Sequence, residues 1–398
     1  MSLLVLNAGS TSLKFALFEP QTCQELLAAS LDWADGNRQA AKLVLRTPAA
    51  PDFSATVAVA DPHAAAECAL RVAQERTQIS LVGHRVVYGG TLFPEHRRID
   101  AEVKAAIRRL SDLAPLHNPP ALAAIEAAEA ALPGIPQVAV FDTMFFAQLP
   151  PRAYLYPLPY EWHERFGLRR IGFHGISNAF CLCRAAELLG REPGQVRLIT
   201  CHLGGGCSAT AVRNGHPVNT TMGFSPLDGL MMGSRPGSLD PGLLLHLQRT
   251  CGLTFRQIDH ALNHRSGLLG ISGLSADLAQ IETAADAGNV RARWAFEMFA
   301  DRVRGAIGSL AVTLGGLDAL VFTDRMGEGS PALRSAVCQG LECLGLHLDP
   351  QQNTNCQADA DIATAESAGR ILVLRTREEL MIARESRRVI AGDNPRPA

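Results

Sequence analysis

Two segments far apart in the chain share one layout, and this duplication constrains the fold more than any other feature of the sequence. Residues 4–17 and residues 199–212 each read as an apolar strand, a turn rich in glycine and serine, and a second strand. A tight turn between two strands is typical of a β-hairpin. Two hairpins of the same layout therefore predict a duplicated α/β fold.

Both predicted turns are suited to binding phosphate. Their glycines let backbone N–H groups converge on an anion with no Cβ in the way. Side chains add further donors, which are Asn7, Ser10, Ser12, Lys14 and Ser208. The alternative is a pair of ordinary tight hairpins, since glycine and serine are common turn residues. Because the two segments match each other, we interpret both turns as binding sites for a phosphorylated ligand.

Length and composition favour two domains and a small-molecule partner. The 398 residues exceed what one hydrophobic core usually organises, and 47% of them are apolar. The formal net charge is -2, so the chain lacks the excess of basic residues expected of a nucleic-acid binder. The first residues carry no basic leader, and no apolar run is long enough to span a bilayer. We therefore expect a cytoplasmic protein with no membrane or nucleic-acid partner.

The first half of the chain alternates strand and helix signals after a weakly patterned stretch. Residues 22–78 predict loops with short elements, and residues 79–87 predict a buried strand. Residues 100–113 and 118–132 predict helices that begin at Asp100 and at a His-Asn-Pro-Pro sequence. Residues 138–142 predict a strand with Asp142 at its carboxyl end, where open α/β sheets present ligand groups.

The second half repeats this scheme after a Pro/Tyr-rich crossing at residues 151–160. A helix is predicted over 178–189, followed by the second hairpin. Residues 319–323 predict a strand that leads into a turn over 324–330. A last strand near 371–374 precedes a helix from Glu378 to about Val389.

Several side chains outside the hairpins could serve phosphoryl transfer, which needs alignment and positive charge on the transferred group. Arg85 ends a predicted strand, and Arg235 lies in a loop framed by glycine and proline. His174 and His202 lie among small residues. The alternatives are surface arginines and satisfied core histidines. The sequence has neither a P-loop nor a dinucleotide-binding glycine motif, so the hairpins themselves must hold the phosphate.

These segments together resemble the acetokinase family, within the sugar kinase, Hsp70 and actin superfamily. The resemblance spans essentially the whole chain and rests on residues 7–14, 83–87, 115–120, 141–143, 172–175, 222–230 and 378–380. It implies two duplicated ribonuclease-H-like domains of the actin/Hsp70 type with a cleft between them. Residues 1–150, completed by a helix over about 377–391, would form the first, and residues 151–376 the nucleotide-side and dimerisation domain.

The resemblance further implies the reaction and the partners. It is the Mg²⁺-dependent, reversible transfer of the ATP γ-phosphoryl group to acetate, giving acetyl phosphate and ADP, with Mn²⁺ as a substitute metal. A cytoplasmic homodimer is implied. Arg85 and Arg235 would hold the carboxylate and the transition-state phosphoryl group, and His174 would stabilise the latter. Asp142 would orient the carboxylate, and the metal ligand would be Glu378, with Asn7 beside it.

The implied acetate pocket is small and apolar. Val87, Leu116, Phe173 and Pro226 would line it, and His117 would line the same cleft. Acetate is already ionised at neutral pH, so alignment and charge neutralisation suffice without a strong base. The sequence leaves acetate and propionate open, because one methylene changes binding by only about 1–3 kcal/mol in such a site.

The implied nucleotide site departs from the family pattern. Its residues would be His202, Gly204, Gly205, Gly206, Asp277, Arg325, Met326 and Gly327. The family has Asn where this chain has Gly205, and an Arg where it has Ala279. Its turn Thr-Ala-Gly-Ile-Gly-Glu-Asn-Ser corresponds here to Thr323–Ser330, so Asp324, Arg325, Met326 and Gly329 replace four of its residues.

Three interpretations of this nucleotide side stay open. In the first, ATP binds in a remodelled pocket, with Arg325 turned to solvent or stacked on the base. In the second, the phosphoryl donor lacks a base, as pyrophosphate does. In the third, the chain is a silent carboxylate-binding protein, which would have no need to retain Arg85, His174 and Arg235 together.

Overall fold

The protein divides into two compact units that are described separately. The computed structural model describes residues 1–9, 11–33, 40–48, 50–115 and 117–392. Unit 1 comprises Met1–Ala147 and the C-terminal segment from Arg377, and unit 2 comprises Gln148–Thr376. The expected sites Ser10 and Leu116 lie outside the described residues.

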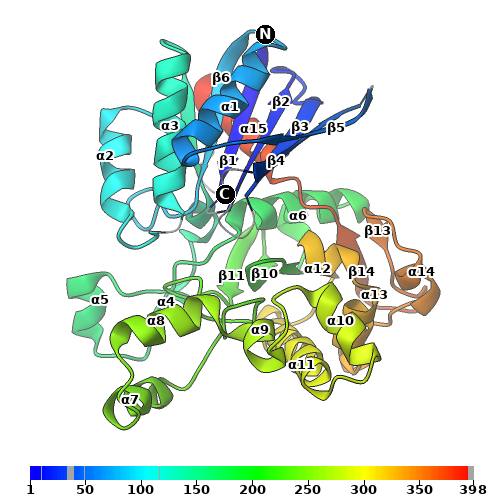
Figure 1. Cartoon of the computed structure of the whole chain (residues 1–398). Helices are drawn as coiled ribbons and strands as arrows, with labels where there is room; N and C mark the ends of the chain where they lie inside the picture. Colours follow the sequence, from blue (N-terminus) through cyan, green and yellow to red (C-terminus); the bar gives the residue numbers. More distant parts are fainter. Residues whose placement is uncertain (10, 34–39, 49, 116, 393–398) are drawn as a thin grey trace. The chain divides into compact units, whose positions relative to one another are not determined.

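Unit 1 is built on an eight-stranded sheet in the order β5-β4-β3-β2-β1-β6-β8-β7 (Figure 1). β1 pairs antiparallel with β2, as the first hairpin requires, and parallel with β6, which is itself parallel to β8. β1 is buried along its whole length, which fits the apolar run Leu3–Leu6 at its centre. The strands are β1 Ser2–Ala8, β2 Ser12–Phe18, β3 Glu25–Asp32, β4 Ala41–Thr47, β5 Ala50–Val57, β6 Ile79–Val86, β7 Arg97–Arg98 and β8 Gln137–Phe141.

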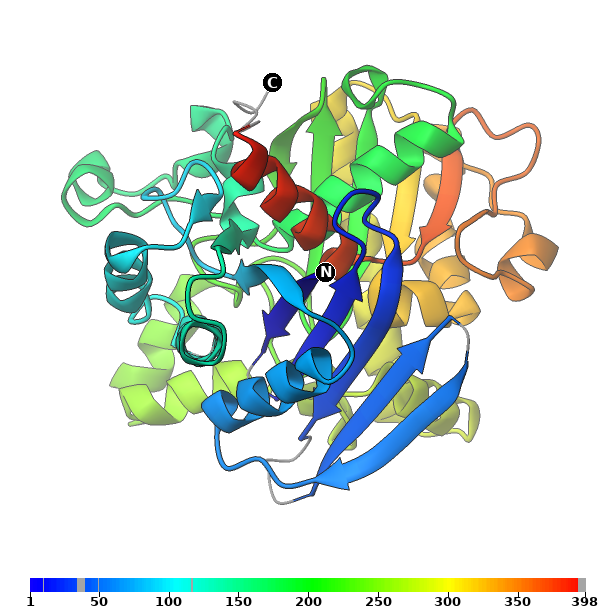
Figure 2. The ribbon, with the colours of Figure 1, turned by 90° about the horizontal axis from the view of Figure 1, so that it is seen from above.

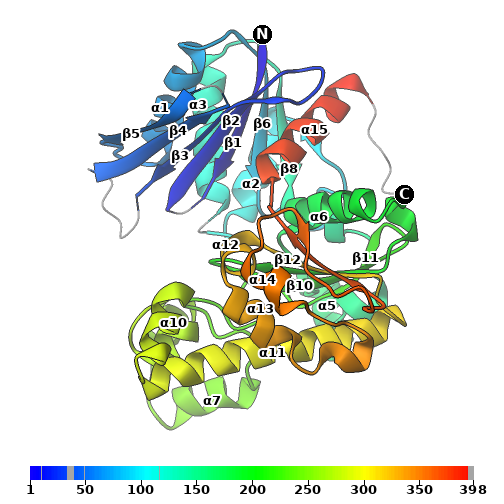
Figure 3. The same ribbon diagram turned by 90° about the vertical axis from the view of Figure 1, so that its right-hand side faces the viewer.

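Helices cover both faces of this sheet. α1 (Pro62–Gln74) and α3 (Asn118–Ala131) pack together on one face, with α2 (Ala101–Leu110) beside α3. α15 (Glu378–Ala391) lies on the other face, against β1, β6 and β8 (Figures 2 and 3). A methyl group at Gly83 of β6 would collide with Ser386 of α15, so glycine here permits close packing of helix on strand.

Unit 2 repeats the central topology of unit 1. Its six-stranded sheet has the order β11-β10-β9-β12-β14-β13. β9 pairs antiparallel with β10 in the second hairpin and parallel with β12, which is parallel to β14. The predicted duplicated α/β fold is therefore confirmed. The strands are β9 Leu198–Leu203, β10 Cys207–Arg213, β11 His216–Thr220, β12 Ala319–Thr323, β13 Ala360–Asp361 and β14 Arg370–Leu374.

The sheet of unit 2 is also covered on both faces. α6 (Gly175–Leu188) packs on one face and the long α11 (Val290–Leu314) on the other (Figure 3). The remaining α-helices of the described unit are α4 Pro151–Tyr154, α5 Tyr160–Phe166, α7 Pro241–Arg249, α8 Phe255–His264, α9 Gly267–Ser272, α10 Leu278–Asp286, α12 Asp324–Gly329, α13 Pro331–Cys338 and α14 Pro350–Thr354. In the described part of the chain, no helix is both long and apolar enough to cross a membrane.

Two expectations about local structure were wrong. Residues 22–78 are not mainly loops, because they form β3, β4, β5 and α1. β5 is largely exposed, so it lacks the apolar alternation that identifies a half-buried strand. The turn expected at 324–330 is instead the short helix α12, whose first residue, Asp324, has a left-handed φ of 63°.

Two buried histidines make the stability of unit 1 sensitive to acid. His84 Nε2 lies 2.6 Å from Gln137 Oε1, and His96 Nδ1 accepts a hydrogen bond from the Phe141 N–H. Burial lowers the pKa of His84 to about 4, and burial with nearby Arg388 lowers the pKa of His96 to about 3. Both residues are therefore neutral in the folded protein at pH 5, whereas the unfolded chain takes up protons below about pH 6.5.

We expect the free energy of unfolding to fall as pH decreases from 6.5 toward 4. The unfolded state binds more protons in this window, so stability rises with pH across it. Urea unfolding at pH 7.5, 6.0 and 5.0 measures the slope, and a His84→Gln variant should show a shallower one. Equal slopes for the variant and the parent would exclude His84 as a source of the effect.

Candidate active site

Unit 1 holds a polar cluster of candidate residues at one edge of its sheet. Asn7 lies near the end of β1, Arg85 near the end of β6, and Asp142 directly after β8. Because these strands are parallel, their carboxyl ends meet at the same edge. α15 adds Glu378 and Glu379 from its first turn. The structure thus brings together the residues of unit 1 expected to hold a carboxylate and a metal ion.

Arg85 is the centre of this cluster. Its Nε and Nη2 atoms donate to Asp142 Oδ2 at 3.2 and 2.6 Å, and its Nη1 atom donates to Asn7 Oδ1 at 3.2 Å. Nη1 also lies 3.5 Å from Glu378 Oε2. Burial opposes the charge of Arg85, but Asp142 and then Glu378 outweigh burial and raise its pKa. Asp142 is fully buried, and Arg85 supplies a cation that pairs with its carboxylate.

The carboxylates beside Asn7 fit a magnesium site. Asn7 Nδ2 donates to Glu378 Oε2 at 3.2 Å and to Glu379 Oε1 at 2.9 Å, which sets two carboxylates side by side. Among the described residues, no group of three or more His, Cys, Asp or Glu could hold a metal on its own. The two carboxylates of Glu378 and Glu379 are nevertheless the kind of donor set that Mg²⁺ uses in kinases. There the ion binds one or two carboxylates and completes its shell with waters and substrate phosphates.

The other candidate residues of unit 1 differ in how far they are exposed. Lys14 pairs with Asn7 across β1 and β2 and is exposed, whereas Ser12 is half-buried and its carbonyl accepts from the Gly9 N–H. Of the expected acetate pocket, Val87 is buried in unit 1. His117 is half-buried and precedes α3 without capping it through its side chain.

A second cluster of candidate residues surrounds the hairpin of unit 2. His174 Nδ1 lies 2.9 Å from Ser208 Oγ, and the rings of His174 and His202 stack with centroids 4.0 Å apart. His202 Nδ1 lies 2.9 Å from Ser177 Oγ, which accepts a hydrogen bond from Thr376 Oγ1. These contacts fix both imidazoles beside the Gly204–Gly206 turn.

Arg235 reaches the same turn. Its Nη1 donates to Pro226 O at 2.9 Å and its Nη2 to Gly205 O at 3.4 Å. A methyl group at Gly206 would lie 3.1 Å from both Arg235 Nη2 and His174 Nε2. Glycine at this position therefore leaves room for two cationic or proton-bearing groups above the hairpin. Burial lowers the pKa of Arg235, although its ordinary value keeps it charged at neutral pH.

Four other residues expected on the nucleotide side lie at two helices, with Asp277 directly before α10 and Arg325, Met326 and Gly327 in α12. Arg325 Nη1 donates to Asp277 Oδ2 at 3.0 Å, and Asp277 also caps α10 by accepting from the Ala279 N–H. Arg325 is thus tied to Asp277 while 62% of its side-chain surface stays exposed to solvent. Met326 is buried, and Gly327 packs against β9 and β12. Phe173 and Pro226, expected in the acetate pocket, are buried and half-buried in unit 2.

Sequence reasoning missed three supporting residues of unit 2. Ser177 and Thr376 hold His202, and Glu328 Oε1 accepts from the backbone N–H groups of Asp324 and Thr376. Ser177 follows His174 by three residues at the start of α6, which was a usable local signal. Nothing in the sequence alone brings Thr376 to the same place.

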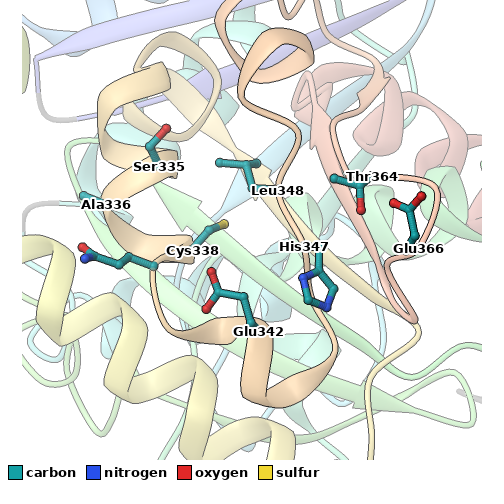
Figure 4. A pocket seen from close by; sticks show the side chains of 9 residues that line it. Ser335, Ala336, Cys338, Glu342, His347, Leu348, Thr364 and Glu366 are labelled. Carbon is teal, nitrogen blue, oxygen red and sulfur yellow. The ribbon is translucent and has the colours of Figure 1, made fainter.

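A separate hollow of about 630 Å³ in unit 2 contains none of the expected site residues (Figure 4). Its described lining comes from α13 and the segments that follow it, namely Ser335, Ala336, Cys338, Gln339, Glu342, His347, Leu348, Thr364 and Glu366. The candidate chemistry therefore lies at the hairpins and not at this hollow.

The chain is a two-unit α/β protein with duplicated hairpin sheets and cationic side chains beside each hairpin, and solved structures of two acyl kinases are similar to it over nearly its whole length. The crystal structure of Porphyromonas gingivalis acetate kinase has a TM-score of 0.89 and 37% identity, covering 98% of this chain and 99% of that one. A propionate kinase from Francisella tularensis has a TM-score of 0.88 and 35% identity, covering 96% and 98%.

Comparison of the sequence with known proteins identifies the family. An acetate kinase from Gloeobacter violaceus is 49% identical over 400 residues, which cover 97% of this chain and 98% of that protein. Residues 2–384 match the acetokinase family. The chain belongs to the acetokinase family.

Proposed function

We propose that the protein is an acetate kinase, a phosphotransferase that moves the γ-phosphoryl group of ATP to acetate and forms acetyl phosphate and ADP. The single observation that carries this proposal is the near full-length identity of 49% to an acetate kinase, with both charged clusters present. The first hairpin and the unit 1 cluster would hold the acceptor and the metal, and unit 2 would hold the donor.

Unit 1 supplies the groups for the acceptor. Arg85 has a forked guanidinium that can bind a carboxylate through two hydrogen bonds, and Asp142 fixes its orientation. Because acetate is already an anion, its attack on phosphorus needs alignment more than proton removal. Glu378, with Asn7 and Glu379 beside it, would hold Mg²⁺, which neutralises charge on the phosphates when bound.

Unit 2 supplies the groups for the transferred phosphoryl. Arg235 and His174 meet above Gly206, so both can donate to equatorial oxygens as negative charge builds up in the transition state. The Gly204–Gly206 turn would bind the donor phosphates through its backbone. ATP is the donor that family membership favours, and Asp277 and Arg325 would lie on its nucleotide side.

We further propose a cytoplasmic homodimer that forms through unit 2. No residue of α7 is buried, although it carries Leu243, Leu244, Leu245 and Leu247. An apolar hollow of about 360 Å³ runs between α7 and α8, and exposed Leu243 lines it. A second copy of the chain would cover this apolar surface.

An assay of acetyl phosphate formation tests the function. Purified protein is incubated with acetate or propionate, Mg²⁺ and, in turn, ATP, GTP or pyrophosphate, and the acyl phosphate is trapped with hydroxylamine. We expect product with acetate and ATP, at a higher kcat/KM than with propionate, and none after addition of EDTA. Product with pyrophosphate alone would contradict ATP as donor, and no product with any donor would contradict the kinase assignment.

A further inference from the structure

The carboxylate of Asp324 lies at the hairpin turn of unit 2. Its Oδ2 atom is 3.2 Å from His202 Nε2, and a methyl group added at Gly204 would collide with this same oxygen. Asp324 follows β12, whose last residue, Thr323, pairs with His202 of β9. Parallel pairing of these two strands therefore delivers an acidic side chain to the face of the turn.

The hydrogen bonds around His202 suit an anion at this position. Thr376 Oγ1 donates to Ser177 Oγ, which leaves the Ser177 hydroxyl to donate to His202 Nδ1. In that arrangement the proton of the neutral imidazole is on Nε2, where it points to the Asp324 carboxylate. A phosphate oxygen would require the same donor.

Hydrogen bonding holds the backbone of Asp324 in place beside the turn. Its N–H donates to Glu328 Oε1 at 3.0 Å, and Arg325 is tied to Asp277. Asp324 has a φ of 63°, a left-handed conformation that is uncommon outside glycine but is tolerated by Asp and Asn. The hydrogen bond from the Asp324 N–H to Glu328 and the ion pair of Arg325 with Asp277 keep the Asp324 carboxylate at the hairpin.

We propose that Asp324 is an internal anion that competes with the phosphoryl donor for the second hairpin and thereby sets donor affinity and selectivity. The identity of the ligand as a donor rests on the proposed function. Its chemical class is a diphosphate or triphosphate, either nucleoside-linked or inorganic. Two negative groups at one turn repel each other, so the carboxylate must rotate away from His202 before the donor phosphates bind.

Titration calorimetry with two variants tests this proposal without requiring turnover. Asp324→Asn keeps the size of the side chain and tolerates the left-handed backbone, but it removes the charge. Asp324→Gly removes the side chain and relaxes the backbone. The probes are Mg²⁺–ADP and Mg²⁺–pyrophosphate, each titrated into the full-length protein.

We expect both variants to bind at least one probe about fivefold tighter or more, with no change in the binding of acetate. A gain with both probes indicates competition at the shared phosphates, whereas a gain with ADP alone indicates a nucleoside-linked donor. A gain below fivefold for both probes in both variants would overturn the proposal, as would weaker binding.

Asp301→Asn is the matched control, because it changes the net charge equally at an exposed position of α11. It should leave the affinity for both probes unchanged. If the parent protein makes no acetyl phosphate but Asp324→Asn still binds ADP more tightly, the proposed function fails and the role of Asp324 stands.

Discussion

Replacing Arg235 by alanine is expected to lower kcat for acetyl phosphate formation by about a hundredfold or more. Arg235 and His174 converge on Gly206, and Arg235 is held there by the carbonyl oxygens of Pro226 and Gly205. A cation fixed in advance stabilises transition-state charge without reorganisation, which is why one such contact carries a few kcal/mol. Steady-state kinetics with saturating acetate and ATP measures the effect.

Two variants control this experiment. Arg293→Ala removes the same charge from an exposed position on α11 and should retain full activity. Arg235→Lys keeps the charge but loses the planar fork, so we expect a kcat between those of the parent and the alanine variant. A kcat for Arg235→Ala within tenfold of the parent would refute the transition-state role.

Replacing Arg85 by alanine should impair both stability and catalysis. Asp142 is fully buried and Arg85 donates to it through two nitrogen atoms, so the substitution breaks a buried ion pair. Breaking such a pair costs about 3–5 kcal/mol of unfolding free energy. The guanidinium fork that is proposed to bind acetate is lost as well, so we expect a loss of kcat/KM of about a hundredfold or more.

The double variant Arg85→Ala/Asp142→Asn separates these two effects. Neutralising residue 142 removes the buried negative charge that Arg85 paired with, so urea unfolding should show partial recovery of stability over the single variant. Activity should not recover, because the guanidinium is still absent. Recovery of both properties would show that Arg85 acts only through folding.

Much of the fold and of the site could be predicted because the two hairpins are local features. In each hairpin the two strands and the turn lie within one short stretch of sequence. The pairs β1–β2 and β9–β10 can therefore be predicted from neighbouring residues. The resemblance to the acetokinase family then placed Arg85, Asp142 and Glu378 in one site. The structure brings these residues together, although Asn7 and Glu378 are 371 residues apart.

The parts that sequence reasoning could not predict depend on long-range pairing or on exposure. β5 lies at the sheet edge with most of its residues exposed, so no apolar period marks it as a strand. The contact between Asp324 and His202 follows from the register of β12 on β9. The tie between Arg325 and Asp277 joins two helices, and no local pattern specifies it.

The position of α15 has a consequence for the order in which the protein matures on the ribosome. Unit 1 takes its first segment from residues before 148 and its last helix from residues after 376. Nascent chains fold from the N-terminal end as they are made. The carboxylate of Glu378, which is proposed to hold the metal, is thus delivered only after all of unit 2 has been translated, so the proposed metal site is completed last.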